Sequence, residues 1–147
     1  MAHFAEIDKN GVVLRVLTAC NQDIANNGGE LSKQAATYFQ SYTPLSSNGV
    51  KYIQTSYNHN FRGRYAGVGM IYKSDIDKFI SPQPFASWSL DENGVWQAPV
   101  TPPTILLDSN NKFYNLAWDE PNQKWVSTDS NNTSFEWDSS IFSWKSV

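Results

Sequence analysis

Two side chains, Cys20 and His59, are of the types that form a catalytic nucleophile and its base. A thiol becomes a strong nucleophile when a histidine takes its proton, and such a pair needs to be close only in the folded chain. The sequence around these two residues shows no Asn or Asp pattern that would mark them as a catalytic pair. Cys20 follows the apolar run at 14–19, so the favoured interpretation is a small hydrophobic side chain buried at the end of a strand.

Acidic side chains occur in two pairs that could supply a general acid and base or bind calcium. Asp75 lies near Asp77, and Asp91 precedes Glu92. Each pair falls in a predicted turn, where carboxylates accept local backbone hydrogen bonds, and the chain contains no calcium-binding loop with enough oxygen ligands. One cysteine and two histidines are too few for a usual zinc site. We therefore expect no catalytic residues, no metal and no cofactor, and predict that the protein is not an enzyme.

A third candidate is the run 57–65, which mixes aromatic rings with two arginines on an acidic chain. Arg62, Arg64 and Tyr65 are residues of the kind that bind carboxylates or stack on planar groups. The net charge of -3 lacks the positive field that phosphate binding needs. We therefore expect contact with an acidic protein surface and no nucleic acid. The alternative is a surface loop whose arginines are simply solvated.

The backbone that carries these residues is predicted to form hairpins. Asn10-Gly11 is a favoured two-residue turn, and β-prone segments flank it within 5–17. The acid of such a turn accepts backbone hydrogen bonds, and the flanking aromatic side chains can meet across the two strands. The same pattern of an apolar residue, a polar turn and another apolar residue returns at 72–79, 90–96, 107–113, 118–125 and 137–144.

Tryptophans flank the last two of these turns at identical spacing. They could form exposed platforms for a sugar or choline. They could equally form the core of thin hairpins, or an apolar surface buried against another subunit. The last two hypotheses are favoured because short strands poor in Leu, Ile and Val must draw their burial from aromatic rings. The predicted partner-binding residues are Trp118, Trp125, Trp137 and Trp144, together with Arg62, Arg64 and Tyr65.

The pattern as a whole predicts a mainly β (α+β) fold of short antiparallel hairpins, as a sheet or sandwich. One amphipathic helix is expected over about 29–42, where Leu31, Ala35, Tyr38, Phe39 and Tyr42 share one face. Prolines at 99, 102 and 103 favour a stiff extended spacer. We therefore predict an N-terminal β domain at 1–101 and a C-terminal Trp-hairpin region or arm at 102–147.

Length and composition set the outer limits. A chain of 147 residues can bury a core without disulfides or metal. No stretch approaches the roughly 18 apolar residues of a membrane span, and the first residues lack the basic and apolar regions of a signal peptide. We expect a protein made in a cytoplasm that does not bind membranes. Only 17% of the residues are charged and 14% are aromatic, which is typical of a neutral surface that binds other surfaces.

Segments over the first two-thirds of the chain resemble a family of small virion-associated proteins of marine tailed phages, cyanophages especially. The segments are Met1-Ala2-His3-Phe4-Ala5, Ile53-Gln54-Thr55-Ser56-Tyr57-Asn58, Asn60-Phe61-Arg62, Tyr65-Ala66-Gly67-Val68-Gly69, Pro82-Gln83-Pro84-Phe85-Ala86-Ser87-Trp88-Ser89-Leu90-Asp91-Glu92 and Trp96-Gln97-Ala98-Pro99-Val100. The resemblance implies a virion component and brings no catalytic residues with it. Sequences of that family end sooner, with a single Trp-Asp hairpin, whereas this chain has two.

The sequence thus predicts a structural component of a tailed-phage virion, made in the host cytoplasm. It would attach to capsid proteins, as decoration or cement, or to tail proteins, through β-hairpin and tryptophan contacts. It would do so as a homo-oligomer or in many symmetric copies. Capsid decoration is slightly favoured because the chain is short and mildly acidic. The alternative is a glycan-binding adhesin module of the tail or fibre. A wall-degrading enzyme would need an acid and base pair that the sequence does not offer.

Overall fold

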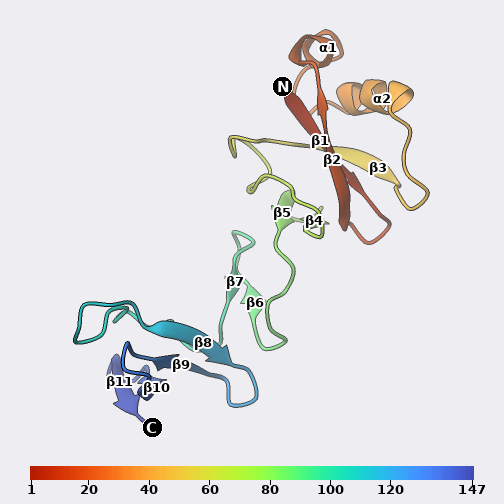
Figure 1. The fold of residues 1–147 in the computed structure, drawn as a ribbon. Helices are drawn as coiled ribbons and strands as arrows, with labels where there is room; N and C mark the ends of the chain where they lie inside the picture. The colour runs from red at the N-terminus through yellow and green to blue at the C-terminus, as the bar shows by residue number, and fades with distance from the viewer. The chain divides into compact units, whose positions relative to one another are not determined.

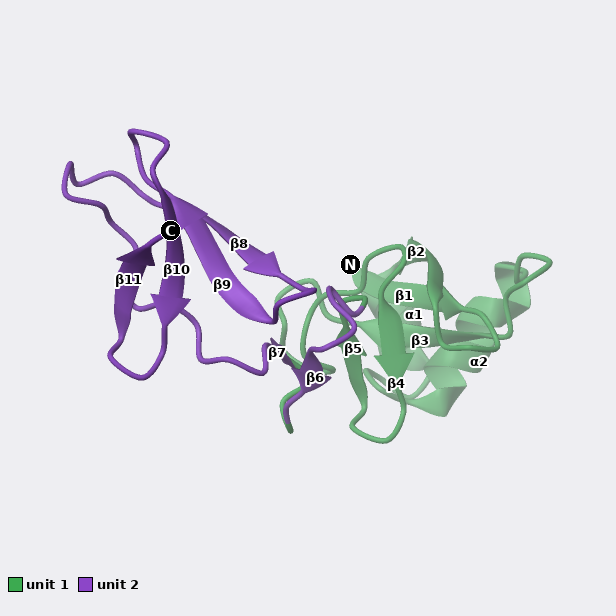
Figure 2. Cartoon of the chain, turned by 90° about the horizontal axis from the view of Figure 1, so that it is seen from below, with its two compact units in different colours: residues 1–82, 92–95 green, residues 83–91, 96–147 purple.

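The computed structural model describes residues 1–147 and is mainly β (Figure 1). Eleven strands form four antiparallel sheets of hairpins, and two short helices accompany them. This confirms the predicted fold class. The chain divides into two compact units, shown in two colours in Figure 2. Unit 1 comprises residues 1–82 and 92–95, and unit 2 comprises residues 83–91 and 96–147. The predicted division after residue 101 stays a prediction.

Unit 1 is built on a three-stranded antiparallel sheet. Strand β1 (Ala2–Ile7) lies between β2 (Val13–Ala19) and β3 (Lys51–Thr55). The predicted turn joins β1 to β2: the carboxylate of Asp8 accepts hydrogen bonds from the amides of Asn10 at 2.8 Å and Val12 at 2.9 Å. Gly11 has φ +82°, which a residue without a side chain adopts at no cost. The first predicted hairpin is confirmed.

The helices pack on one face of this sheet. Helix α2 (Lys33–Tyr42) stacks Phe39 on Phe4 of β1 with ring centroids 4.5 Å apart, as an amphipathic helix should. It begins later than predicted, because Ser32 caps it by accepting a hydrogen bond from the Ala35 amide at 3.0 Å. Leu31 therefore lies outside the helix.

A second helix, α1 (Asn21–Asn26), was not predicted. It has six residues, too few for a periodic apolar pattern, and only Ile24 in it is buried. Cys20 directly precedes α1 and is exposed, so the prediction of a buried thiol was wrong. The buried small residue that ends β2 is Ala19.

The remaining predicted hairpins are all present. In unit 1, β4 (Ile71–Lys73) pairs with β5 (Lys78–Ile80). In unit 2, β6 (Ser89–Leu90) pairs with β7 (Trp96–Gln97), and Leu107 forms an isolated bridge with Phe113. Beyond these lies a four-stranded antiparallel sheet in the order β11-β10-β9-β8, made of β8 (Asn115–Asp119), β9 (Lys124–Thr128), β10 (Ser134–Asp138) and β11 (Ser143–Ser146).

The tryptophan pairs meet as the equal spacing predicted. Trp118 is the direct cross-strand partner of Trp125, and Trp137 is that of Trp144. The ring centroids are 5.2 Å apart in both pairs, at interplanar angles of 68° and 66°. Each pair is thus an edge-to-face contact, the geometry that aromatic quadrupoles favour.

The same five-residue turn occurs three times in the chain. Its third occurrence forms a connection between strands that the sequence analysis did not predict. Asp108 and Asp129 repeat the bonding of Asp8, because each carboxylate accepts the amides two and four residues later. Asn111 and Asn132 take the left-handed position with φ +59° and +62°. The turn at Asp129 joins β9 to β10. Its signal was the sequence Asp-Ser-Asn-Asn, which occurs at both 108–111 and 129–132.

Phe142, in the turn between β10 and β11, is strained. It has φ +49° and is 56% exposed, although bulky side chains disfavour this backbone region. We expect Phe142→Asn to raise the free energy of unfolding of unit 2 by about 0.5–1 kcal/mol, since Asn tolerates this conformation. Denaturant titration followed by tryptophan fluorescence measures the change. The exposed neighbour Ile141 has no positive φ, so Ile141→Asn is the control and should give no gain. A loss of stability in Phe142→Asn would show that the ring makes contacts that outweigh the strain.

Candidate functional site

The two faces of the β8–β11 sheet differ, and this difference defines the candidate site. On the inner face Trp118 and Trp125 are 8% exposed and Trp137 is 6% exposed. Trp144 is half-buried beside them. Residues 85–91 and 96–100 of unit 2 cover this face with Phe85, Trp88, Ala98 and Val100. The predicted partner-binding tryptophans are therefore the core of unit 2.

Hydrogen bonds from the indoles fix this cover in place. Trp125 donates from Nε1 to the carbonyl of Val100 at 3.0 Å, and Trp118 donates to Oε2 of Glu120 at 2.6 Å. The same carboxylate accepts from the amide of Ser87 at 2.8 Å and from its hydroxyl at 2.7 Å. These bonds, led by that of the Ser87 hydroxyl, lower the pKa of Glu120. Since the cover is bonded to the sheet, Trp118, Trp125 and Trp137 do not form open platforms for a sugar.

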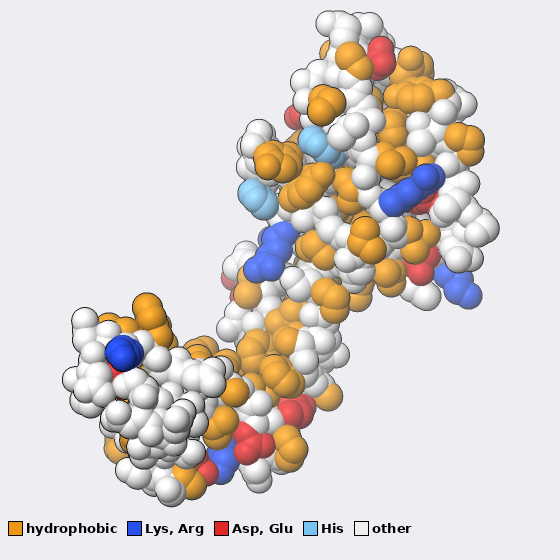
Figure 3. All heavy atoms as spheres, in the orientation of Figure 1, with side chains coloured by type: hydrophobic (Ala, Val, Ile, Leu, Met, Phe, Trp, Pro, Cys, Tyr) orange, Lys and Arg blue, Asp and Glu red, His pale blue; other side chains and the backbone are white.

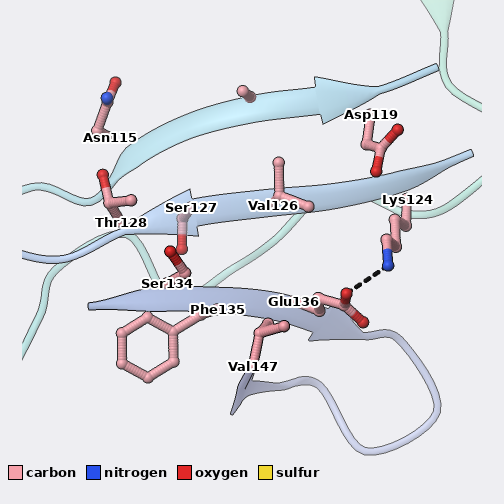
Figure 4. Close-up of a pocket in the computed structure, with 11 residues that line it drawn as sticks. Asn115, Asp119, Lys124, Val126, Ser127, Thr128, Ser134, Phe135, Glu136 and Val147 are labelled. Atoms are coloured by element: carbon pink, nitrogen blue, oxygen red, sulfur yellow. Dashed lines mark hydrogen bonds and ion pairs between the residues drawn. The ribbon is translucent and has the colours of Figure 1, made fainter. Parts of the chain in front are cut away.

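The outer face of the same sheet is uncovered. It holds a hollow of about 340 Å³ (Figure 4), whose floor includes the cross-strand pair Ala117 and Val126. Polar side chains border the floor, and at one end Lys124 forms an ion pair with Glu136. We call the following residues the outer face: Asn115, Ala117, Asp119, Lys124, Val126, Thr128, Ser134 and Glu136.

Apolar side chains extend the outer face beyond β8. Phe113 precedes β8 by two residues and forms an isolated bridge with Leu107. Phe113 is 79% exposed, and Leu107 is also exposed. The next residue, Tyr114, packs on Trp144, with the ring centroids 5.2 Å apart. Large apolar side chains therefore stand in solvent next to a hollow with an apolar floor, a combination typical of protein-binding surfaces.

Asp108 holds this extension against the sheet. Besides closing its own turn, its carboxylate accepts from the amide of Ser130 at 2.9 Å. Asn110 donates from Nδ2 to the hydroxyl of Ser130 at 3.0 Å. The hydrogen bonds from Ser130 and from the amide of Lys112 hold the pKa of Asp108 far below its usual range. The exposed Phe113 is thus carried on a braced hairpin.

Few charges on this sheet are unpaired. Lys145 forms an ion pair with Asp138, as Lys124 does with Glu136. The bonds that Asp138 accepts, with Lys145 first, keep its pKa well below the ordinary range. Hydrophobic side chains reach the surface in many places on the visible face in Figure 3, with few charged ones between them. A partner of the outer face would meet its apolar floor and the polar side chains that border it.

The other predicted site residues belong to unit 1. Arg62 donates to Asp77 at 2.7 Å and to the carbonyl of Gln54 at 3.0 Å, and lies over the Tyr72 ring. It therefore braces its own loop. Arg64 donates to the hydroxyl of Ser81 at 3.0 Å. Their role in binding a partner stays a prediction.

Tyr65, His59 and Asp77 each contact other groups of unit 1. Tyr65 packs edge-on against His3, with ring centroids 5.3 Å apart. Nδ1 of His59 accepts a hydrogen bond from the Tyr65 amide at 3.2 Å. The carboxylate of Asp77 is held by Arg62 and the Tyr72 hydroxyl. No group of three or more His, Cys, Asp or Glu side chains lies close enough to hold a metal ion.

Neither helix is long and apolar enough to span a membrane. No protein-family model matches the chain, and neither a curated protein sequence nor a solved structure matches it.

Proposed function

We propose that the protein is an accessory structural subunit of a tailed-phage virion, bound through the outer face of unit 2 to a capsid or tail protein. The observation that carries this proposal is the contrast between the two faces of one sheet. The inner face is closed by the chain's own residues, whereas the outer face holds a hollow with an apolar floor, and Phe113 is exposed two residues before β8. The resemblance of the first two-thirds of the chain to virion-associated phage proteins supports the proposal that the protein belongs to a virion.

The proposed mechanism is burial of apolar surface. A partner segment would cover Ala117, Val126 and Phe113, and each square ångström of apolar area removed from water contributes about 25 cal/mol. The edge strands β8 and β11 each have a neighbour on one side only, so a strand of the partner could extend the sheet. The buried tryptophans keep the sheet rigid, so little conformational entropy is lost on binding.

This geometry favours assembly over the alternative of a glycan-binding adhesin built on the tryptophan hairpins. Stacking on a sugar needs an open indole face, and Trp118, Trp125 and Trp137 are covered. The outer face has no tryptophan. Assembly needs an exposed apolar surface on a stable scaffold, and the outer face provides one. Decoration of the capsid remains the favoured position.

Substitutions on the outer face test the proposal. Ala117→Arg and Phe113→Glu put a charge where the partner would bury the surface, and both positions are exposed, so the chain should still fold. We expect each variant to be incorporated at least about tenfold less than the wild type, the effect of 1.4 kcal/mol in binding. The measurement is the intensity of the 16.6 kDa band in purified virions.

The matched control for Ala117→Arg is Val68→Arg, which adds the same positive charge at an exposed apolar position of unit 1. It should be incorporated at the wild-type level. Wild-type incorporation of both outer-face variants would contradict the proposed surface. Absence of the wild-type chain from purified virions would contradict the proposed function as a whole.

A further inference from the structure

Unit 1 contains a polar cavity of about 170 Å³ that none of the features above explains. It lies where the start of β1 meets the end of β3 and the loop that follows it. Its wall includes His3, Gln54, Ser56, Tyr57, Asn58 and Asn60, with Glu30 from the segment before α2. The volume suits a ligand of about the size of one sugar ring.

A buried donor without a partner lies in this wall. Gln54 is 3% exposed, and its Oε1 accepts a hydrogen bond from the amide of Leu31 at 2.8 Å. Its Nε2 is buried and has no hydrogen-bond partner. A buried amide group that donates nothing is costly to the fold, and such groups in native proteins call for an explanation.

An aromatic cluster forms one side of the opening. Tyr57 is 65% exposed and stacks on His3, with centroids 5.9 Å apart and an interplanar angle of 26°. Tyr65 packs edge-on against both rings, at 5.3 Å from each. This cluster holds an exposed phenol ring at a polar cavity, where its face can pack against the C–H groups of a ligand.

The loop that carries these residues is held before any ligand arrives. The hydroxyl of Ser56 accepts from the amide of Asn60 at 2.9 Å, and that of Thr55 accepts from the amide of Ala66 at 2.9 Å. His59 and Arg62 have φ +58° and +55°, conformations that cost energy and persist because the surrounding bonds impose them. Strain of this kind in a fixed loop is typical of a preorganised binding site.

We propose that this cavity binds a neutral sugar unit, such as the terminal residue of a surface glycan. Amide side chains both donate and accept hydrogen bonds, which matches the hydroxyl groups of a sugar. The wall holds no Lys or Arg side chain, and it includes Glu30 as well as the amino-terminal Met1, so no net positive charge selects a phosphate or carboxylate ligand. The polar lining disfavours an apolar ligand. The inference is independent of the proposed virion function, because the cavity lies in unit 1 and the outer face in unit 2.

NMR titration of the full chain with the methyl glycosides of glucose, galactose, mannose and N-acetylglucosamine tests the proposal. At least one glycoside should shift the side-chain amide signals of Gln54 and Asn58 with a dissociation constant in the millimolar range, which corresponds to about 4 kcal/mol or less. Tyr57→Ala should weaken binding at least about tenfold, since the stacking face is lost. Tyr57→Phe keeps the ring and should stay within about twofold of the wild type.

The outer-face variant Phe113→Glu serves as the control and should bind the glycoside as the wild type does. Because Tyr57 is exposed, its substitution should not unfold unit 1, and the dispersion of the amide spectrum checks this. The proposal is overturned if none of the four glycosides shifts these signals at about 50 mM, or if Tyr57→Ala binds as tightly as the wild type.

Discussion

Replacing Trp125 with alanine is expected to unfold unit 2 while unit 1 stays folded. Trp125 contacts Trp118 and Trp88, with centroids 5.2 and 5.7 Å away, and its indole holds the covering segment through Val100. Loss of a buried aromatic side chain from the centre of a core lowers the free energy of unfolding by about 3–5 kcal/mol. This is a large share of the total free energy of unfolding of a unit of this size. Near-ultraviolet circular dichroism and the amide spectrum of each unit measure the outcome.

The comparison variant is Trp144→Ala. Trp144 makes the same kind of cross-strand pair but is half-buried at the edge strand, so its loss should lower stability without unfolding unit 2. Equal effects of the two substitutions would contradict the distinction between centre and edge. A fully folded Trp125→Ala protein would contradict the conclusion that the indoles form the core.

The second large effect is expected for Glu6→Gln in unit 1. Glu6 is fully buried at the centre of the sheet, where it pairs with Arg15 and accepts from the amide of Ser46 at 2.6 Å and from the Ser46 hydroxyl. Gly49 passes so close that an added Cβ would lie 1.8 Å from Oε1 of Glu6. An amide has no charge to pair with Arg15, and its NH₂ group would face the donors of Ser46 or Arg15 inside the sheet, so we expect unit 1 to lose about 1–3 kcal/mol.

The pH dependence of the free energy of unfolding separates the contribution of the charge of Glu6 from that of its shape. Burial alone would raise the pKa of Glu6, but the hydrogen bonds from Ser46 and Arg15 outweigh it and lower the pKa below its ordinary value of 4.5. A lowered pKa means that the stabilisation is present above pH 4.5 and is lost as the pH falls through the pKa of the folded protein. Urea unfolding of unit 1 between about pH 3 and pH 7 should show a steeper acid loss for the wild type than for Glu6→Gln. Identical slopes would contradict this account of Glu6.

The hairpins could be predicted from the sequence because their determinants are local. Asp8 and Gly11 close a turn with bonds that span four residues, and the equal spacing of the tryptophans sets the cross-strand register. The same local code was present at Asp129 and was overlooked. The fold class and the aromatic pairs therefore followed from short-range patterns alone.

What covers each face could not be predicted, because it depends on contacts between distant segments. Val100 meets Trp125 across twenty-five residues, and Ser87 meets Glu120 across thirty-three. Nothing local in the sequence indicates that the proline-rich segment turns back over the indoles. The unpaired amide of Gln54 is hidden for the same reason, since its surroundings come from β1, β3 and a loop. Sequence reasoning thus found the aromatic residues but not which face remained free.

A reconstruction of the assembled virion with this chain traced in it tests the central claim most directly. The account predicts that another virion protein covers Ala117, Val126 and Phe113, while Trp118 and Trp125 remain inside unit 2 under residues 85–91 and 96–100. An outer face open to solvent in the particle, or tryptophans turned outward into the partner, would contradict it.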